Sequence, residues 1–386
     1  HAMSYVAAKE ATCTELGNIE YWTCEYCGGC WDNEAGTGMP LNQMMVIIPM
    51  AEHEYENGVC TVCGAADPEM TGSIRLASAA LNLKEKVSIV YYAVDGQVAT
   101  DNANVAERGV LLYESAEKAA TRDPSQAKEI VSLEWDEQQE KYVGQSEGID
   151  ARDMDKSQFA VGYLKLTNGQ YIYGTKKNGD EQTIEYSPLI YCRNKQNDAE
   201  VGLLSRALMH YGAAAQVAQY GMSSGLMNEG FEAVAYDANV LGETVFSVDT
   251  AVTNGMKLRN AALDLQGAIS YIVRFTKEGV ASDKTLYAEY SLLGETGEVE
   301  LVYNTELEQW EAIISGVPAK DMGATLRVKA YYLDENGAKV YGGELVYSGY
   351  EYVRRTLNSN TAAENTKSLA KALAMYIYYA DQYGNH

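Results

Sequence analysis

The chain has 386 residues and a formal net charge of −24 at pH 7. Nucleic acid and anionic membranes are poor partners for such a chain, because both need clustered Lys and Arg. A hydrophobic content of 46% is enough for packed cores and excludes a disordered acidic chain. There is no run of 18 apolar residues, so we expect no membrane insertion.

Residues 1–70 are predicted to form a small Cys/His module. Six of the seven cysteines and two of the four histidines lie there. A segment this short cannot bury enough apolar surface to fold alone, so it needs a cross-link. Two Cys-x-x-Cys pairs, each followed by Gly, suit knuckles that bind structural zinc. Disulfides in an exported protein, or free thiols, are the alternatives.

The candidate zinc ligands fall into two sets. The first set has four members, His1, Cys13, Cys24 and Cys27. The second set is incomplete, with Cys30 as a candidate fourth ligand beside His53, Cys60 and Cys63. Nothing in either set indicates the open coordination position of a catalytic zinc, so the predicted role is structural.

Two stretches of this module resemble a known family. They read ATCTELGNIEYWTCEYCGGCW (residues 11–31) and HEYENGVCTVCGAADPE (residues 53–69). They are similar to the Cys/His repeats of multidomain surface proteins of gut Gram-positive anaerobes of the Clostridia. In that family His precedes Thr-Cys and then Cys-x-x-Cys-Gly, and a shorter unit reads His-x-Tyr-x-x-Gly-x-Cys-x-x-Cys-Gly. Cys30 departs from the pattern, because an aromatic residue is usual there.

The resemblance implies a place on the cell surface. Several such proteins are non-catalytic, and the starch-adherence components of ruminococcal cell-surface assemblies are the most suggestive comparison. By this resemblance we expect an extracellular chain that is part of a larger surface protein or assembly. The abrupt start at His1 inside a motif also indicates a fragment of a longer protein.

Beyond the module, one stretch occurs twice. Residues 149–174 and 317–342 align without a gap, and both contain Asn-Gly between runs rich in Val, Tyr and Leu. Asn-Gly in this setting predicts a β-hairpin with a type I′ turn, because Asn and Gly tolerate the positive φ of both central residues. The match extends upstream, where Trp135 aligns with Tyr303 and Tyr142 with Trp310. The period is about a domain long, which indicates tandem domains.

The predicted fold is mainly β. We expect a zinc-ribbon-like Cys/His module over residues 1–70, followed by two tandem antiparallel β-sandwich (Ig-like) domains over residues 71–226 and 227–386. Alternating apolar residues predict the strands, with a long polar loop over residues 95–108. A C-terminal helix closes each domain, with capping-box starts at Asn197-x-x-Glu200 and Thr361-x-x-Glu364. Residues 231–254 have no counterpart in the first repeat and are expected to add an edge strand or to pack the domains together.

Several isolated features have structural explanations. Gly221-Met222-Ser223-Ser224-Gly225 matches the nucleophile-elbow pattern, but a helix precedes it where a strand is required, so a helix C-cap and a linker are expected. His210 is interpreted as a packing residue of a helix. Cys192 stands alone and is interpreted as an unpaired structural thiol.

The sequence does not predict an enzyme. It lacks a phosphate-binding Gly loop, a dinucleotide fingerprint and a His suited to general-base catalysis. A binding protein is the first hypothesis, because Tyr and Trp rings stack on the apolar faces of sugars and tandem weak sites gain avidity on a polymer. The ligand is then a polysaccharide, with an α-glucan as first candidate by resemblance. The candidate ligand-binding residues are Trp135, Tyr142, Tyr163, Tyr173, Tyr303, Trp310, Tyr331 and Tyr341. The alternatives are an adhesin for a host surface protein and a structural spacer.

Overall fold

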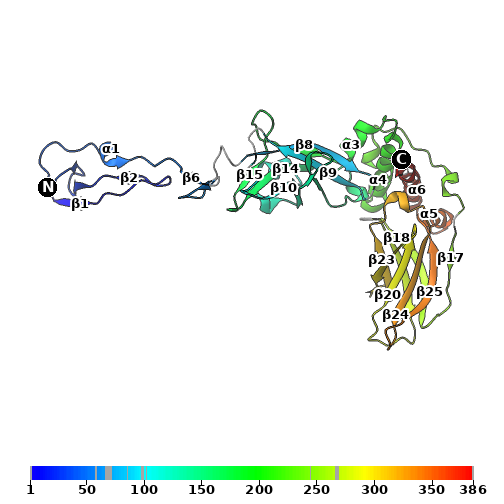
Figure 1. Cartoon of the computed structure of the whole chain (residues 1–386). Coiled ribbons are helices and arrows are strands. Elements are labelled where there is room, and N and C mark those ends of the chain that lie inside the picture. The colour runs from blue at the N-terminus through cyan, green and yellow to red at the C-terminus, as the bar shows by residue number, and fades with distance from the viewer. Residues whose placement is uncertain are drawn as a thin grey trace.

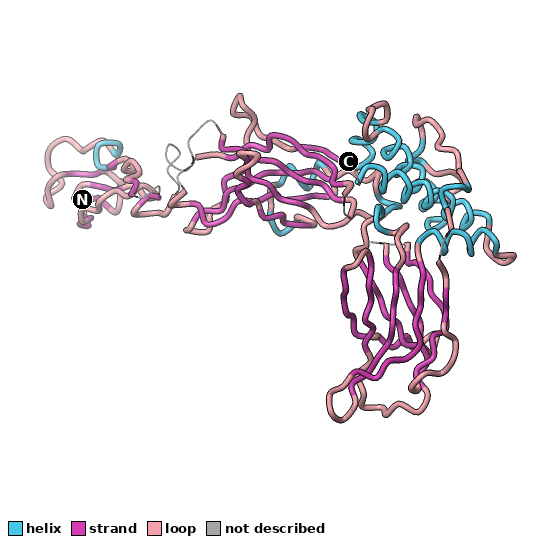
Figure 2. The backbone as a smooth tube through the Cα atoms, turned by 45° about the vertical axis from the view of Figure 1, so that its right-hand side comes forward, coloured by secondary structure: helices cyan, strands magenta, loops and turns pink. Residues whose placement is uncertain are grey.

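The chain is elongated and bent. A computed structural model describes residues 2–56, 59–65, 72–84, 86–96, 100, 102–243, 245–265 and 269–384. The N-terminal module lies at one end, and the strands of the first repeat follow it (Figure 1). The helices gather at a corner, from which the strands of the second repeat extend in another direction (Figure 2). The described chain is mainly β, built of antiparallel sheets as the sequence predicts.

The N-terminal module contains only short strands. They form a three-stranded sheet of order β1-β3-β4 and two two-stranded ladders, β2-β5 and β6-β7. The strands are β1 (Met3–Val6), β2 (Gly17–Asn18), β3 (Tyr21–Cys24), β4 (Cys30–Trp31), β5 (Ile47–Ile48), β6 (Tyr55–Glu56) and β7 (Val59–Cys60), with the one-turn helix α1 at Gln43–Val46. Such short ladders bury few side chains, which agrees with the expected need for a cross-link.

The first repeat contains two antiparallel sheets. One has the order β12-β13-β9-β8, and the other has the order β11-β10-β14-β15 with β16 paired to β14. The strands are β8 (Ile74–Asn82), β9 (Ser88–Asp95), β10 (Val105–Tyr113), β11 (Glu129–Ser132), β12 (Glu134–Asp136), β13 (Lys141–Gln145), β14 (Gln158–Leu166), β15 (Tyr171–Tyr173) and β16 (Ile184–Tyr186). Strand β10 begins inside the stretch predicted to be a loop over residues 95–108, so that loop is shorter than expected.

The second repeat has the same strand order. Its sheets are β22-β23-β19-β18 and β21-β20-β24-β25, and β17 adds an edge strand to β25. The strands are β17 (Ser247–Val248), β18 (Met256–Asp264), β19 (Ser270–Lys277), β20 (Tyr287–Leu292), β21 (Glu295–Glu300), β22 (Val302–Asn304), β23 (Gln309–Ser315), β24 (Leu326–Leu333) and β25 (Lys339–Tyr347). In both repeats, side chains from the two sheets belong to one buried core, which explains the alternating apolar pattern of the strands.

Helices follow the strands of each repeat. The first repeat ends in α3 (Pro188–Lys195) and α4 (Gly202–Tyr220), and the second ends in α5 (Gly349–Asn358) and α6 (Glu364–Gly384). The sequence predicted one closing helix in each repeat and missed α3 and α5. Each missed helix begins after a buried Ser, Ser187 or Ser348, whose side chain accepts a hydrogen bond from a backbone N–H of the first turn.

Both predicted capping boxes are wrong. Helix α4 begins at Gly202, and the side chain of Asp198 accepts hydrogen bonds from the N–H groups of Glu200 and Val201. Helix α6 begins at Glu364, and the Ser359 hydroxyl accepts from the N–H groups that follow it. These hydrogen bonds lie in the turns that precede the helices, before Gly202 and Glu364, and do not cap the first helical turns.

The Asn-Gly hairpins form, but the predicted type I′ turn is wrong. Gly169 and Gly337 have φ values of 88° and 78°, whereas Asn168 and Asn336 are not among the residues with positive φ. The Gly169 N–H donates to the Leu166 carbonyl, and the Leu166 N–H donates to the Gln170 carbonyl. This is a type I turn closed by a glycine bulge, in which only Gly needs positive φ.

The sequence offset between the repeats changes inside the sheets. Strand β8 begins at residue 74 and β18 at 256, an offset of 182, whereas β14 and β24 begin at 158 and 326, an offset of 168. The 14 extra residues of the first repeat lie between β10 and β11, where they form α2 (Ala116–Thr121) and a 3₁₀ turn, η1 (Pro124–Gln126). The corresponding β20 and β21 are joined by Leu293 and Gly294 alone.

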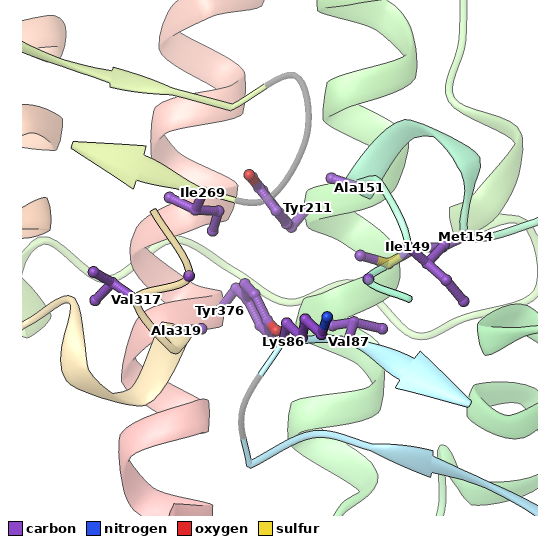
Figure 3. A pocket seen from close by; sticks show the side chains of 12 residues that line it. Lys86, Val87, Ile149, Ala151, Met154, Tyr211, Ile269, Val317, Ala319 and Tyr376 are labelled. Atoms are coloured by element: carbon purple, nitrogen blue, oxygen red, sulfur yellow. The ribbon is translucent and has the colours of Figure 1, made fainter. Parts of the chain in front are cut away.

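The repeats meet where α4 packs against α6. Tyr211 and Tyr376 stack there, with ring centroids 5.4 Å apart and an interplanar angle of 16°. Figure 3 shows these rings between pairs of equivalent side chains from the two repeats. The pairs are Val87 with Ile269, Ile149 with Val317, and Ala151 with Ala319. The cavity between them has about 50 Å³, which is room for water and not for a larger ligand.

Residues 231–254 add an edge strand and also pack the two repeats together, which were the two alternatives that the sequence left open. Besides β17, they contain the 3₁₀ helix η4 (Ala238–Leu241), which packs on α5 and α6. Glu232 forms an ion pair with Arg206 of α4, so the segment also ties the first repeat to the second.

Candidate functional site

A Cys/His group lies beside the β6-β7 ladder, at the end of the N-terminal module that meets the first repeat (Figure 1). Its ligand atoms belong to Cys13, His53, Cys60 and Cys63, and all lie within 4.8 Å of one another. Two distances define its shape: Cys13 Sγ to Cys60 Sγ is 3.7 Å, and Cys63 Sγ to His53 Nδ1 is 3.4 Å. This group could hold a metal ion.

Local backbone structure builds the group. Cys60 and Cys63 lie on a tight turn in which the Gly64 N–H donates to the Cys60 carbonyl at 2.9 Å, and Gly64 has a φ of 73° that favours glycine. Cys13 comes from a distant loop, which a hydrogen bond from Ala51 N–H to Thr12 carbonyl holds beside residue 53. Zn–S bonds of about 2.3 Å in a tetrahedron place two sulfurs about 3.8 Å apart, close to the Cys13–Cys60 separation.

The two closest thiols have opposite pKa shifts. The pKa of Cys60 is lowered to about 6. The largest cause is a hydrogen bond from the backbone N–H of Cys63, and the next is a hydrogen bond with the side chain of His53. Desolvation raises the pKa of Cys13 to about 11, and hydrogen bonds that its thiol donates to Cys63 and Cys60 add to the effect. Thiolates and not thiols bind metals, so Cys60 offers a ligand at neutral pH and Cys13 must lose a proton on binding.

The predicted grouping of ligands is wrong in one respect. Cys13 joins His53, Cys60 and Cys63, and not the set with Cys24 and Cys27. Strand pairing explains this, because it places the Cys24 turn at the end of the β1-β3-β4 sheet, away from the β6-β7 ladder. Cys30 is buried beside the Gly28 carbonyl and does not complete the His53 set. His1 lies outside the described residues.

The second Cys-x-x-Cys pair forms a similar turn. The Gly28 N–H donates to the Cys24 carbonyl at 2.8 Å, and Gly28 has a φ of 65°. None of the seven cysteines, all of which lie in the described part of the chain, is in a disulfide. Cys192 is buried in the helical region, and desolvation raises its pKa to about 12, as expected for a structural thiol.

The module contacts the first repeat through a hairpin. Asn168 Nδ2, at the tip of the β14–β15 turn, donates to the carbonyl of Gly64 at 2.8 Å. Gly64 directly follows Cys63, so the Cys/His group and the first repeat are joined by one residue of the duplicated Asn-Gly turn.

Two of the predicted aromatic pairs lie on equivalent hairpins. Trp135 and Tyr142 face each other across β12 and β13, with ring centroids 5.0 Å apart. Tyr303 and Trp310 face each other across β22 and β23, with ring centroids 5.1 Å apart. Trp135 is 52% exposed and Tyr303 is 45% exposed, whereas their partners are half-buried.

A cation lies over the half-buried ring of each pair. Arg108 is 4.5 Å from the centroid of Tyr142, and Lys277 is 5.5 Å from that of Trp310. Each cation holds the inner ring from one side, a contact worth about 0.5–1 kcal/mol at exposed sites. The outer ring of each pair is thereby left as the ring that is most open to a ligand.

The other four predicted aromatics lie on the second sheet. Tyr163 and Tyr331 are buried, so neither offers a ring face to a ligand as the chain stands. Tyr173 and Tyr341 are half-buried. The Tyr163 and Tyr341 hydroxyls donate to equivalent carboxylates, Glu107 and Glu289. Sequence alternation could not separate these residues, because their burial depends on side chains from other elements: Ala119 of α2 for Tyr163, and Tyr287, Tyr341 and Lys339 for Tyr331.

The nucleophile-elbow pattern lies in a linker. Gly221 ends α4 with a φ of 66°, and a 3₁₀ turn, η3 (Leu226–Asn228), follows. No strand precedes Ser223, as the sequence predicts. His210 lies on α4. Burial lowers the pKa of its imidazole, and a hydrogen bond with the backbone of Glu232 opposes this shift in part.

Comparison with known proteins does not assign the chain to a family. No protein-family model matches this chain, and no curated protein matches it. Among the helices in the described residues, none combines the length and the apolar character needed to cross a membrane.

Proposed function

We propose that this chain is a non-catalytic extracellular protein whose two β-rich repeats bind a neutral polysaccharide. The observation that carries the proposal is the exposed aromatic pair found on the same hairpin of both repeats, Trp135 with Tyr142 and Tyr303 with Trp310. An open ring next to a second ring suits the apolar face of a sugar. Two copies on one chain give avidity toward a polymer that neither copy has alone.

The net charge of the chain restricts the class of polysaccharide that it can bind. A net charge of −24 repels acidic polysaccharides, so a neutral chain of sugars is favoured. A starch-type α-glucan is the first candidate, and this rests on the resemblance of the N-terminal module. In fold terms, we assign each repeat to the immunoglobulin-like β-sandwich type, because four- and five-stranded antiparallel sheets share one core.

Native gel electrophoresis of the whole chain through neutral polysaccharides tests the proposal. We expect an α-glucan to retard the chain, Trp135→Ala or Tyr303→Ala to reduce the retardation, and the double variant to abolish it. The matched control is Tyr26→Ala, which removes a ring that is 87% exposed in the N-terminal module. If the double variant migrates like the parent chain in every gel, or no polysaccharide retards the parent, the proposal is wrong.

We propose in addition that Cys13, His53, Cys60 and Cys63 bind one structural zinc ion. The donor set is three sulfurs and one nitrogen that lie within 4.8 Å of one another, and this combination is a common structural zinc set. Native mass spectrometry of the whole chain should show zinc that is lost on Cys60→Ser. Chelation should abolish the chemical-shift dispersion of the N-terminal module while that of the repeats persists. Dispersion of the module that survives complete removal of metal would contradict this role.

A further inference from the structure

The sheets that contain β14 and β24 have the same strand order but different outer faces. In the first repeat, α2 covers this face and forms a small second core with it. The core residues are Leu111, Tyr113, Ala119, Val161 and Tyr163. In the second repeat the connection that would carry such a helix is a two-residue turn, so no equivalent of α2 covers β24.

The side chains of this face differ accordingly. Phe159 and Val161 of β14 correspond to Arg327 and Lys329 of β24. Val161 is fully buried, whereas Arg327 is exposed and Lys329 is half-buried. Two charged residues replace two apolar residues at the positions where the covering helix is missing. The open face is therefore unsuited to another apolar helix and suited to a polar ligand.

A hollow of about 260 Å³ lies on this open face. Its walls include the basic side chains of Arg327 and Lys329, the acidic side chains of Glu289 and Glu344, the Ser291 hydroxyl and the Tyr341 ring. The hollow is slightly smaller than typical ligand pockets, which have about 300–1,000 Å³, so it fits a small unit and not a folded partner.

Three contacts hold these walls in place. The Tyr341 hydroxyl donates to Glu289 at 2.6 Å, and Lys329 Nζ lies 5.3 Å from the Tyr341 ring centroid. Arg327 pairs loosely with Glu344 at 4.0 Å. Two cations and two carboxylates balance, so the hollow does not select a net charge. It offers donors and acceptors around an aromatic ring, which is the chemistry that hydroxyl groups of a sugar require.

We propose that this hollow on the second repeat is a binding subsite for a sugar unit of a neutral glycan, and that the first repeat has no counterpart. The proposal rests on the glycan-binding function proposed above, but it uses a different sheet from the aromatic pairs. It makes the repeats unequal: both present the hairpin pair, and only the second presents the subsite.

Isothermal titration of the whole chain with neutral oligosaccharides, starting with α-glucan fragments, tests this subsite. We expect the double variant Arg327→Ala and Lys329→Ala to lower the association constant about tenfold, because hydrogen bonds from charged donors to the ligand are lost. The matched control is Lys165→Ala on the corresponding sheet of the first repeat, which should leave binding unchanged. Ser291→Tyr, which fills the hollow, should have the same effect as the double variant, and circular dichroism of each variant reports folding.

The outcomes separate the two proposals. Weaker binding in the Arg327/Lys329 variant with unchanged binding in Lys165→Ala supports the subsite. Parent-like binding in both the double variant and Ser291→Tyr overturns it, while loss of binding in the Trp135/Tyr303 variant would still support the aromatic pairs. Absence of binding by the parent chain to any neutral glycan overturns both.

Discussion

The two repeats are copies of one strand arrangement, and the largest difference between them lies at one connection. In the first repeat, the chain between β10 and β11 forms α2 and η1. In the second, β20 and β21 are joined by Leu293 and Gly294 at φ values of 55° and 89°. Both central residues then have positive φ, which is the geometry of a type I′ hairpin. This loop, together with a smaller insertion between β15 and β16 where the second repeat has the continuous β25, separates two otherwise similar domains.

The connection between β10 and β11, or between β20 and β21, determines whether the outer face of the neighbouring strand has apolar or charged side chains. Under α2, the face of β14 is apolar and becomes a second core. Without a covering helix, the corresponding face of β24 has cations that lie over tyrosine rings: Lys339 is 4.2 Å from the centroid of Tyr331. The comparison teaches that the inner faces of these sheets maintain the fold, whereas the outer faces are free to diverge.

The largest expected effect comes from exchanging the two faces. Val161→Lys places an ammonium under α2 with no partner, and we expect a loss of about 3–5 kcal/mol in the free energy of unfolding. The reverse change, Lys329→Val, removes a half-buried cation from an open face and should cost less than about 1 kcal/mol. Calorimetry of the whole chain checks both, and equal losses would refute the contrast between a covered and an open face.

The next effect should be the same in both repeats. Ser187 and Ser348 cap α3 and α5 with equivalent hydrogen bonds of 3.2 Å, to the N–H groups of Ile190 and Glu351. Replacing either Ser with Ala should cost about 1 kcal/mol. Urea unfolding followed by circular dichroism measures the two losses, with Ser359→Ala, in the turn between α5 and α6, for comparison. Losses that differ by much more than their error would mean that the helices of the two repeats are not equivalent.

The sequence predicted the strands better than the turns that join them. Period-2 alternation is a local property of half-buried strands, so the order of β elements and the duplicated hairpins could be read from the residues. The turn type could not, because Asn-Gly fits both type I′ and a type I turn with a glycine bulge. The type I′ geometry occurs instead at Leu293-Gly294, where close pairing of Leu292 with Glu295 imposes it.

The candidate site shows the same limit. Cys60-x-x-Cys63 and His53 could be grouped from their spacing, because a tight turn brings them together. Cys13 could not be placed with them, since its position depends on a distant hydrogen bond between residues 12 and 51. Likewise, Tyr163 is buried in a small core that includes Ala119 of α2, whereas Tyr331 is buried against Tyr287, Tyr341 and Lys339. These are tertiary contacts that periodicity does not contain.

A smaller effect should distinguish the two Asn-Gly turns. Asn168 Nδ2 donates to Gly64 of the module, whereas Asn336, at the equivalent turn, lies at the far end of the second repeat. Asn168→Ala should loosen the module by about 0.5–1.5 kcal/mol, the net value of one hydrogen bond. Nuclear spin relaxation of the module should then show faster independent tumbling, and Asn336→Ala should not change it. Unchanged tumbling in Asn168→Ala would show that this contact does not hold the module.

The smallest effect is a pH dependence on the open face of the second repeat. The Tyr341 hydroxyl lowers the pKa of Glu289 by donating a hydrogen bond, and Lys339 lowers it further. A folded-state pKa below the unfolded value of about 4.3 stabilises the fold above that pH, and this contribution is lost as the pH falls through the folded-state pKa. Glu289→Gln should therefore destabilise the chain at pH 7 by at most about 1 kcal/mol, as expected for an exposed charge pair, and by less at pH 3, where protonation removes part of the contribution. Thermal unfolding at both pH values measures the difference, with the exposed Glu306→Gln as control. An equal loss at pH 7 and pH 3 would mean that Glu289 acts through packing and not through its charge.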